Sequence, residues 1–84
     1  MSREYRYYVY ILQSLVNPER FYTGLTADLR KRVAEHNGGK SIHTNKFRPW
    51  MLRTYIGFSD RSSAQKFETY LKSASGRAFM TKRF

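Results

Sequence analysis

Two helical segments hold the residues whose types and spacing could do chemistry. In LRKRVAEHN, Leu29 and Val33 form the apolar stripe of a helix. Arg32 and His36, four residues apart, fall together on the border of that stripe. Arginine matches the fork of a phosphate, and histidine can hydrogen-bond or transfer a proton near neutral pH. Taken alone, the pattern also fits a solvent-reaching arginine and a half-buried structural histidine. Four positions are expected to face away: Arg30, Lys31, Ala34 and Glu35.

In the second segment, RSSAQKFETYLK, a carboxylate falls on the face that should be buried. Ala64, Phe67 and Leu71 share one side of the helix, and Glu68 lies within the same arc. An unpaired buried carboxylate is costly, so Glu68 should pair with a cation, take up a proton or ligate a metal. A structural ion pair is one interpretation, because the chain has 16 Lys and Arg residues. The other is a Mg²⁺ site, since water and phosphate oxygens complete the coordination of that ion.

Tyrosine hydroxyls are the third candidate group. Most of the seven tyrosines are expected to serve packing. Tyr10 and Tyr22 differ, because a hairpin would pair their strands. Their hydroxyls would then converge on one face near a turn at Gly24, where the first helix begins.

The strands that carry these tyrosines are expected to form a hairpin. Residues 6–13 are aromatic and β-branched, with both faces apolar, which predicts a central strand covered on two sides. Asn17 and Pro18 predict a turn, and residues 21–23, ending at Gly24, predict the second strand.

Helix signals and a third strand complete the predicted architecture. Thr26 or Asp28 should cap the first helix, which should end at the Asn-Gly-Gly of residues 37–39. Residues 50–56 predict a third strand, closed by Gly57. Three further features are expected: a cap at Asp60 or Ser62, a second helix through Leu71, and a short third helix over residues 77–84. The predicted fold class is α/β, with a three-stranded, mainly antiparallel sheet flanked by helices.

Length and composition limit the class of protein. Eighty-four residues predict a single domain, residues 1–84. The chain has no cysteine, which excludes disulfides and thiolate zinc sites and fits a cytoplasmic location. No apolar run is long enough for a membrane span, and the N-terminus does not resemble a signal peptide.

The charge indicates a polyanionic partner. Sixteen basic residues against six acidic ones give a net charge of +10, distributed along the chain. Such a field attracts phosphate backbones whatever their sequence. The expected nucleic-acid-binding residues are Arg30, Lys40, Lys46 and Lys72.

Several of these residues also occur together in one known family. Tyr8-Val9-Tyr10, the run YTGLTADLRKRVAEHN and the later Glu68 resemble the GIY-YIG nuclease superfamily, in particular its small stand-alone bacterial members. The resemblance covers essentially the whole chain. Tyr8 replaces the first glycine of the family motif, and Leu25 stands where some repair-type relatives have lysine.

The resemblance implies a role for each candidate residue. A divalent ion, Mg²⁺ or Mn²⁺, would be held by Glu68, and a tyrosine matching Tyr10 or Tyr22 would help to activate water. Arg32 would bind the scissile phosphate and stabilise its developing charge. His36 would hydrogen-bond near the nucleophile.

The expected function is therefore a metal-dependent endonuclease that cleaves DNA, with RNA as an alternative substrate, in repair, recombination or nucleic acid processing. A protein partner would supply targeting, because no separate recognition domain is evident in the sequence. Two other hypotheses about the function remain. One is a catalytically silent nucleic-acid-binding module with the same basic surface, and the other is a ribosome- or partner-associated protein.

Overall fold

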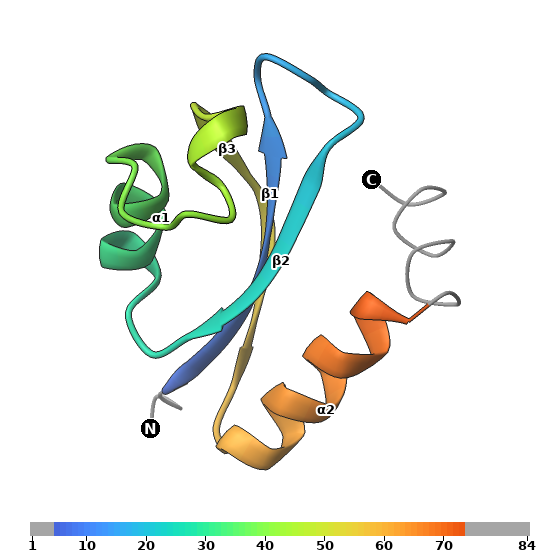
Figure 1. The fold of residues 1–84 in the computed structure, drawn as a ribbon. Helices are drawn as coiled ribbons and strands as arrows, with labels where there is room; N and C mark the ends of the chain where they lie inside the picture. The colour runs from blue at the N-terminus through green and yellow to red at the C-terminus, as the bar shows by residue number, and fades with distance from the viewer. Residues whose placement is uncertain (1–4, 74–84) are drawn as a thin grey trace.

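The computed structural model describes residues 5–73, which form a three-stranded antiparallel sheet between two helices. Strand β1 (Tyr7–Ser14) lies in the middle, with β2 (Phe21–Thr26) on one side and β3 (Trp50–Phe58) on the other. Helices α1 (Leu29–Asn37) and α2 (Arg61–Lys72) lie on opposite sides of the sheet (Figure 1). The predicted α/β class and the central first strand are confirmed.

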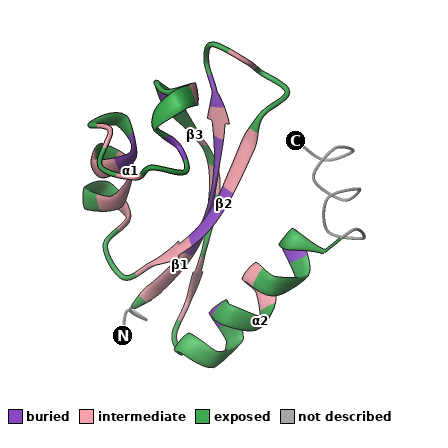
Figure 2. Cartoon of the chain, viewed as in Figure 1, coloured by how far each residue is buried: buried purple, intermediate pink, exposed green. Residues whose placement is uncertain are grey.

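Both faces of β1 are buried, as its apolar pattern predicts. Val9 and Ile11 pack against the α2 side, where Ala64 and Leu71 are the buried contacts. Tyr10 and Leu12 point to the other face, toward Trp50 and α1. Figure 2 shows the resulting band of buried residues along the centre of the sheet. One strand therefore supplies the centre of two apolar clusters.

Strands β2 and β3 and helix α2 run longer than the sequence predicts. Strand β2 continues through Gly24 to Thr26, and β3 continues through Gly57 to Phe58, because pairing with β1 extends past both glycines. Gly24 thus lies within a strand and not at a turn. Helix α2 ends one residue later than expected, at Lys72. A short 3₁₀ helix, η1 (Asn45–Phe47), was not predicted. The expected third helix over residues 77–84 lies outside the described residues.

Side-chain caps fix both helix starts. Asp28 is the cap of α1, its carboxylate accepting from the backbone N–H of Lys31 at 3.1 Å. Asp60 caps α2 in the same way through Ser63, at 2.8 Å. Gly39, with a φ of 79°, follows the end of α1, where the sequence predicts a stop.

The loop between α1 and β3 is tied down by hydrogen bonds to its backbone. The side chain of Asn37 both donates to the carbonyl and accepts from the N–H of Trp50. The indole of Trp50 donates to the carbonyl of Thr44 at 2.8 Å, and Ser14 donates to that of Phe47 at 2.7 Å. These contacts fix Thr44 beside the end of α1.

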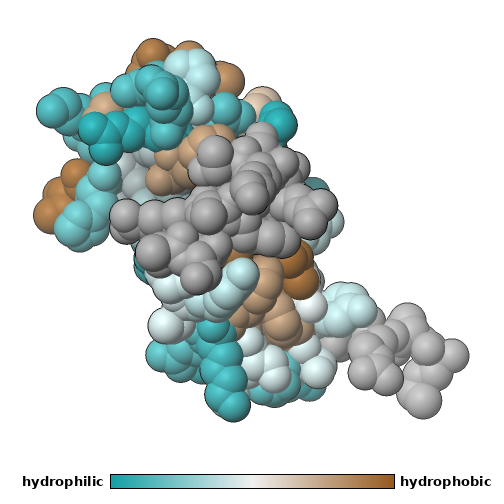
Figure 3. Space-filling view, turned by 90° about the vertical axis from the view of Figure 1, so that its right-hand side faces the viewer, coloured by the Kyte–Doolittle hydropathy of each residue, from teal (hydrophilic) through white to brown (hydrophobic). Residues whose placement is uncertain are grey.

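Figure 3 views the molecule from the side of α2, where apolar surface lies in patches between hydrophilic side chains. Ile56, which pairs with Val9 on this face, is partly exposed. Neither helix within residues 5–73 combines the length and apolar character that crossing a bilayer requires.

Gly24 provides the first prediction, because it faces the ring of Tyr10 across the β1–β2 pairing. A Cβ at position 24 would lie 2.3 Å from the Tyr10 hydroxyl oxygen, closer than any real contact. We expect Gly24→Ala to lower the free energy of unfolding by about 1–3 kcal/mol in urea denaturation, from overpacking.

Gly38→Ala is the matched control, since the nearest atom to its added Cβ is 3.2 Å away. A Tyr10→Leu substitution should relieve much of the Gly24→Ala penalty, because it removes the ring that the new methyl group meets. Equal stability losses for the two glycine variants would contradict the proposed contact.

Candidate active site

A row of three hydrogen-bonded side chains forms the centre of the site. The hydroxyl of Tyr10, on β1, lies 2.9 Å from Nε2 of His36, on α1. Nδ1 of the same ring lies 2.7 Å from Oγ1 of Thr44, in the loop that follows. All three side chains are buried, and His36 is fully so. His36 is therefore a core residue with both ring nitrogens engaged, and not a residue on the border of the helix stripe.

The neutral imidazole of His36 has one donor and one acceptor nitrogen, so two arrangements of protons satisfy this row. In one, Nδ1–H donates to Thr44, and Nε2 accepts the proton of the Tyr10 hydroxyl. In the other, Thr44 donates to Nδ1, and Nε2–H donates to the Tyr10 oxygen. The first arrangement lets His36 receive a proton from Tyr10. The second stabilises a Tyr10 phenolate.

Tyr22 lies beside this row, as the hairpin predicts. Its ring centroid is 4.8 Å from that of His36 and 6.3 Å from that of Tyr10. It is partly exposed, whereas Tyr10 is buried. Strand β2 thus brings a second phenol to the solvent side of the same cluster.

Arg32 lies one helical turn before His36 and carries a positive charge to the edge of the cluster. Its guanidinium is 3.0 Å from the carboxylate of Glu35, and its side chain is partly exposed. Glu35 was expected to face away from the core, but it is partly buried and pairs with Arg32 through their i,i+3 spacing. Arg32 also interacts with Tyr10.

The surroundings shift the pKa of two of these groups. Burial raises the pKa of Tyr10 to about 12, although the guanidinium of Arg32 acts in the opposite direction. Burial, and then the charge of Arg32, lowers the pKa of His36. At neutral pH Tyr10 therefore holds its proton and His36 is uncharged, which makes His36 an available proton acceptor.

Glu68 is positioned by α2, within electrostatic range of the site. Its side chain is 19% exposed and its charge contributes to the raised pKa of Tyr10. Lys72, one turn later, lies 3.1 Å away and is half-exposed, so the cation expected as one alternative for Glu68 is present. Among residues 5–73 no group of three or more acidic, histidine or cysteine side chains could hold a metal. Glu68 fits only an ion whose other ligands are water and phosphate oxygens.

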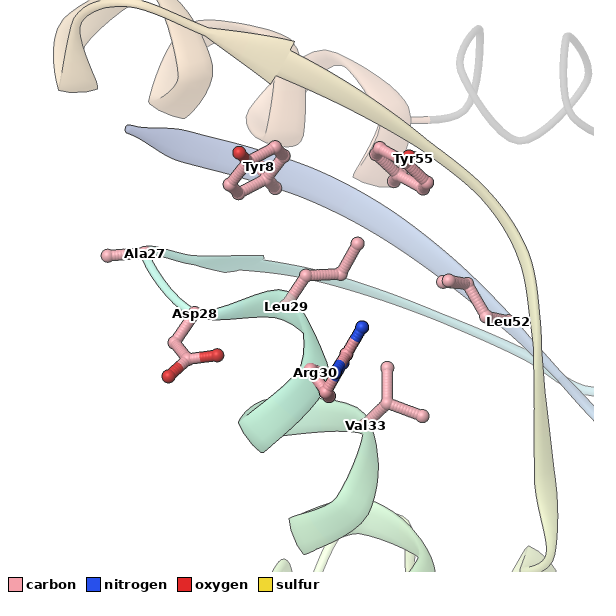
Figure 4. A pocket seen from close by; sticks show the side chains of 8 residues that line it. All are labelled: Tyr8, Ala27, Asp28, Leu29, Arg30, Val33, Leu52 and Tyr55. Atoms are coloured by element: carbon pink, nitrogen blue, oxygen red, sulfur yellow. The ribbon is translucent and has the colours of Figure 1, made fainter. Parts of the chain in front are cut away.

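The four residues expected to bind nucleic acid are all exposed, and they lie on different elements. Arg30 is on α1, Lys40 follows that helix, Lys46 is in η1 and Lys72 ends α2. Arg30 also lines a pocket of about 580 Å³ between the N-terminal end of α1 and the sheet (Figure 4).

The match to a family model agrees with this geometry. The model of the GIY-YIG catalytic domain matches residues 6–83, which include all five candidate catalytic residues. The chain belongs to the GIY-YIG family. The solution NMR structure of a UPF0213 protein from Bacillus halodurans is similar, with a TM-score of 0.54, 28% identity, and coverage of 90% of this chain and 82% of that one.

Relatives of this GIY-YIG domain include UPF0213 proteins and SLX1 proteins. A UPF0213 protein of Streptococcus pyogenes serotype M3 is 35% identical over 84% of the chain and 76% of its own length. The structure-specific endonuclease subunit SLX1 of Candida dubliniensis is 40% identical over 81% of the chain. The corresponding protein of Scheffersomyces stipitis is 42% identical over 74% of the chain. The chain spans 26% and 20% of these two SLX1 proteins.

Two features of this GIY-YIG domain were not found from the sequence. Thr44 lies in a polar loop, and nothing in its spacing links it to His36, eight residues earlier. The pocket beside Arg30 depends on the pairing of Tyr55 with Tyr10, which requires the register of β3. The close approach of Gly24 to Tyr10 was partly accessible, because the hairpin pairs their strands.

The lowered pKa of His36 predicts a loss of stability in acid. The unfolded chain takes up a proton near the ordinary pKa of about 6.5, whereas the buried ring resists it. This contribution to stability is complete above that value and is lost as the pH falls through the lower folded pKa. We expect the melting temperature of the wild type to fall between pH 7.5 and 5.5 by more than that of His36→Gln, as measured by circular dichroism.

His43→Gln is the control, because His43 is exposed and the substitution leaves His36 in place. That variant should keep the acid dependence of the wild type. The same acid dependence in His36→Gln would show that other groups cause it.

Proposed function

We propose that this chain is a metal-dependent endonuclease that hydrolyses phosphodiester bonds in DNA. The observation that carries the proposal is the buried hydrogen bond between Tyr10 and His36 beside the guanidinium of Arg32. The guanidinium of Arg32 can bind a phosphate, and the phenol of Tyr10 is bonded to the neutral imidazole of His36, which can accept a proton. Together these groups are suited to the attack of water on phosphorus. The net charge of +10 supports a polyanionic substrate, and RNA is the alternative.

The names of the SLX1 relatives describe subunits of a structure-specific endonuclease, which supports a substrate chosen by its structure. Branched DNA is the substrate of this kind that we propose. A role in repair or recombination follows from such a substrate. Because the relatives are described as subunits, a protein partner that delivers the domain to its target is part of this proposal.

Arg32 would bind the scissile phosphate. Its side chain is 36% exposed, so a phosphate oxygen can reach the guanidinium from solvent. The guanidinium has five N–H donors, and the bond to Glu35 uses only part of this set. As negative charge builds on the phosphate oxygens during attack, these donors would stabilise it.

Tyr10 and His36 would together remove the proton of the attacking water. Because the pKa of Tyr10 is raised, Tyr10 can accept that proton only while it passes its own to Nε2 of His36. The water oxygen bonds to phosphorus, and the bond to the leaving oxygen breaks with its electron pair going to that oxygen, which takes a proton from solvent. The proton that Tyr10 releases ends on the imidazole of His36. Thr44 then accepts the hydrogen bond of Nδ1–H and holds the ring in position.

Glu68 would hold the divalent ion, Mg²⁺ or Mn²⁺. The ion supplies Lewis-acid stabilisation of the phosphate charge when it is bound. Lys72, the cation that pairs with Glu68, is half-exposed, and an i,i+4 pair with one solvent-exposed partner contributes little stability. The carboxylate can therefore exchange this partner at little cost to the fold.

Cleavage that depends on both metal and Glu68 tests the function. The purified protein, incubated with branched duplex, single-stranded DNA, supercoiled plasmid and RNA, should cleave at least the branched duplex in Mg²⁺ or Mn²⁺ but not in EDTA. Glu68→Gln should abolish cleavage and keep the melting temperature near that of the wild type, because the lost ion pair has a solvent-exposed partner and contributes little stability.

Lys72→Gln is the control, since it breaks the same ion pair and leaves the carboxylate. Salt-sensitive binding without cleavage under any metal would favour the silent binding module. Severe unfolding of Glu68→Gln would assign Glu68 a structural role.

The two tyrosines should differ in their contribution to the rate. Tyr10→Phe removes the hydroxyl that is bonded to His36 and should lower kcat by about 10²–10⁴-fold, the usual contribution of a general base. Tyr22→Phe keeps the ring that packs on His36 and should lower kcat less. Single-turnover cleavage at saturating enzyme measures both. A larger loss of kcat in Tyr22→Phe than in Tyr10→Phe would assign water activation to Tyr22.

A further inference from the structure

The pocket beside α1 lies on the same face of the sheet as Tyr10 and His36. Tyr8 is two residues before Tyr10 on β1, so both side chains point to one face, about 7 Å apart. Tyr55 is the partner of Tyr10 in the register of β3. The pocket is therefore continuous with the site through two neighbouring strands.

Two tyrosine rings form one wall of this pocket. Tyr8 and Tyr55 meet edge to face, with their ring centroids 5.9 Å apart. The hydroxyl of Tyr8 donates to the backbone carbonyl of Tyr5 at 3.1 Å, which restrains its ring. Figure 4 shows both rings on the strands, opposite residues from the first turns of α1. Tyr55 is 52% exposed, so much of its ring is open to a ligand.

The remaining walls are apolar, with a single cation. Leu29 and Val33 of α1 and Leu52 of β3 line the pocket, and Arg30 extends toward the rings (Figure 4). Within residues 5–73, Arg30 makes no ion pair and is available to an anionic ligand. Asp28 turns its carboxylate away from the rings, where it caps α1. The pocket thus combines flat apolar surface with positive charge.

This combination fits a nucleobase attached to a phosphate backbone. Aromatic side chains bind bases by stacking on faces that only an unpaired base exposes, and arginine contacts the flanking phosphate. A volume of about 580 Å³ is within the usual range of small-ligand sites. A base in the pocket would belong to a nucleotide close to the phosphate at Tyr10 and Arg32.

We propose that the pocket formed by Tyr8, Tyr55, Leu29 and Val33 binds an unpaired nucleobase of the substrate strand next to the cleaved phosphodiester. The inference rests on the proposed function and names the feature of the substrate that the domain selects. Base pairs hide the faces that the pocket would stack, so a duplex with a single-stranded arm is preferred to a blunt duplex. Selection is by strand separation and not by base sequence.

Binding to two matched probes tests this proposal. Both are labelled duplexes with a short single-stranded arm. The arm is thymidine in one and abasic sugar phosphate in the other, so the charge is equal and only the bases differ. By fluorescence anisotropy in EDTA, which prevents metal-dependent cleavage, the wild type should bind the thymidine probe about tenfold more tightly.

Tyr55→Ala should bind both probes equally, with the affinity of the wild type for the abasic one. Tyr55→Phe should keep the preference, and Tyr55→Leu, which retains apolar volume without a ring, should lose most of it. Tyr70→Ala is the matched control, because Tyr70 is 45% exposed but lies on α2, away from the pocket. Melting temperatures confirm that each variant is folded.

Three outcomes decide the matter. Loss of the preference in Tyr55→Ala and Tyr55→Leu, but not in Tyr70→Ala, supports base binding in the pocket. Base binding in the pocket is contradicted if the wild type binds both probes equally, or if the preference survives in Tyr55→Ala. If the wild type also cleaves DNA, the proposed endonuclease function still holds. If the wild type binds neither probe, both base binding in the pocket and the proposed DNA substrate are contradicted.

Discussion

The contact between the ring of Tyr10 and the backbone of Gly24 is the constraint on which the rest of the site depends. A phenol in the middle of the central strand can lie flat across the neighbouring strand only where that strand has no side chain. With the ring held there, the hydroxyl meets His36 from the helix above. The same placement buries Tyr10, and burial is the largest cause of its raised pKa.

The two faces of the sheet differ in the side chains that they bury. The side toward α2 is packed with aliphatic and aromatic side chains and provides much of the apolar burial. The side toward α1 also has a buried cluster, but its centre contains hydroxyl and imidazole groups whose hydrogen bonds are complete. No buried side-chain nitrogen or oxygen within the described part of the chain lacks a partner. Polar groups can therefore be buried here without the usual penalty.

Much of this arrangement could be predicted from local patterns. The helices, their caps and the central strand follow from periodicity and capping chemistry, which involve residues close in sequence. The position of Glu68 on the buried arc of α2 could also be predicted, because helical spacing alone determines it. The side chain of Glu68 is 19% exposed, and its ion pair with Lys72 is one of the alternatives that the sequence predicts for it.

Features that depend on distant residues could not be predicted in this way. The link from Thr44 to His36 needs the path of a loop, and that path is set by hydrogen bonds from Asn37 and Ser14 to backbone atoms. The full burial of His36 follows from the same packing, whereas the helical pattern indicated only a border position. Strand lengths were underestimated because glycine was taken to end a strand, but pairing with a neighbour carries β2 and β3 past it.

In the proposed function, the ion pair between Arg32 and Glu35 would affect which anions bind to Arg32. Without substrate, the carboxylate of Glu35 holds part of the guanidinium as an internal substitute for phosphate. Glu35 is attached to the same helix, so its local concentration is far higher than that of a small ion in solution. A free anion must displace this tethered competitor with one set of contacts. A polymer chain would have further phosphates to bind elsewhere on the basic surface, so the pair would disfavour small anions relative to a polyanion.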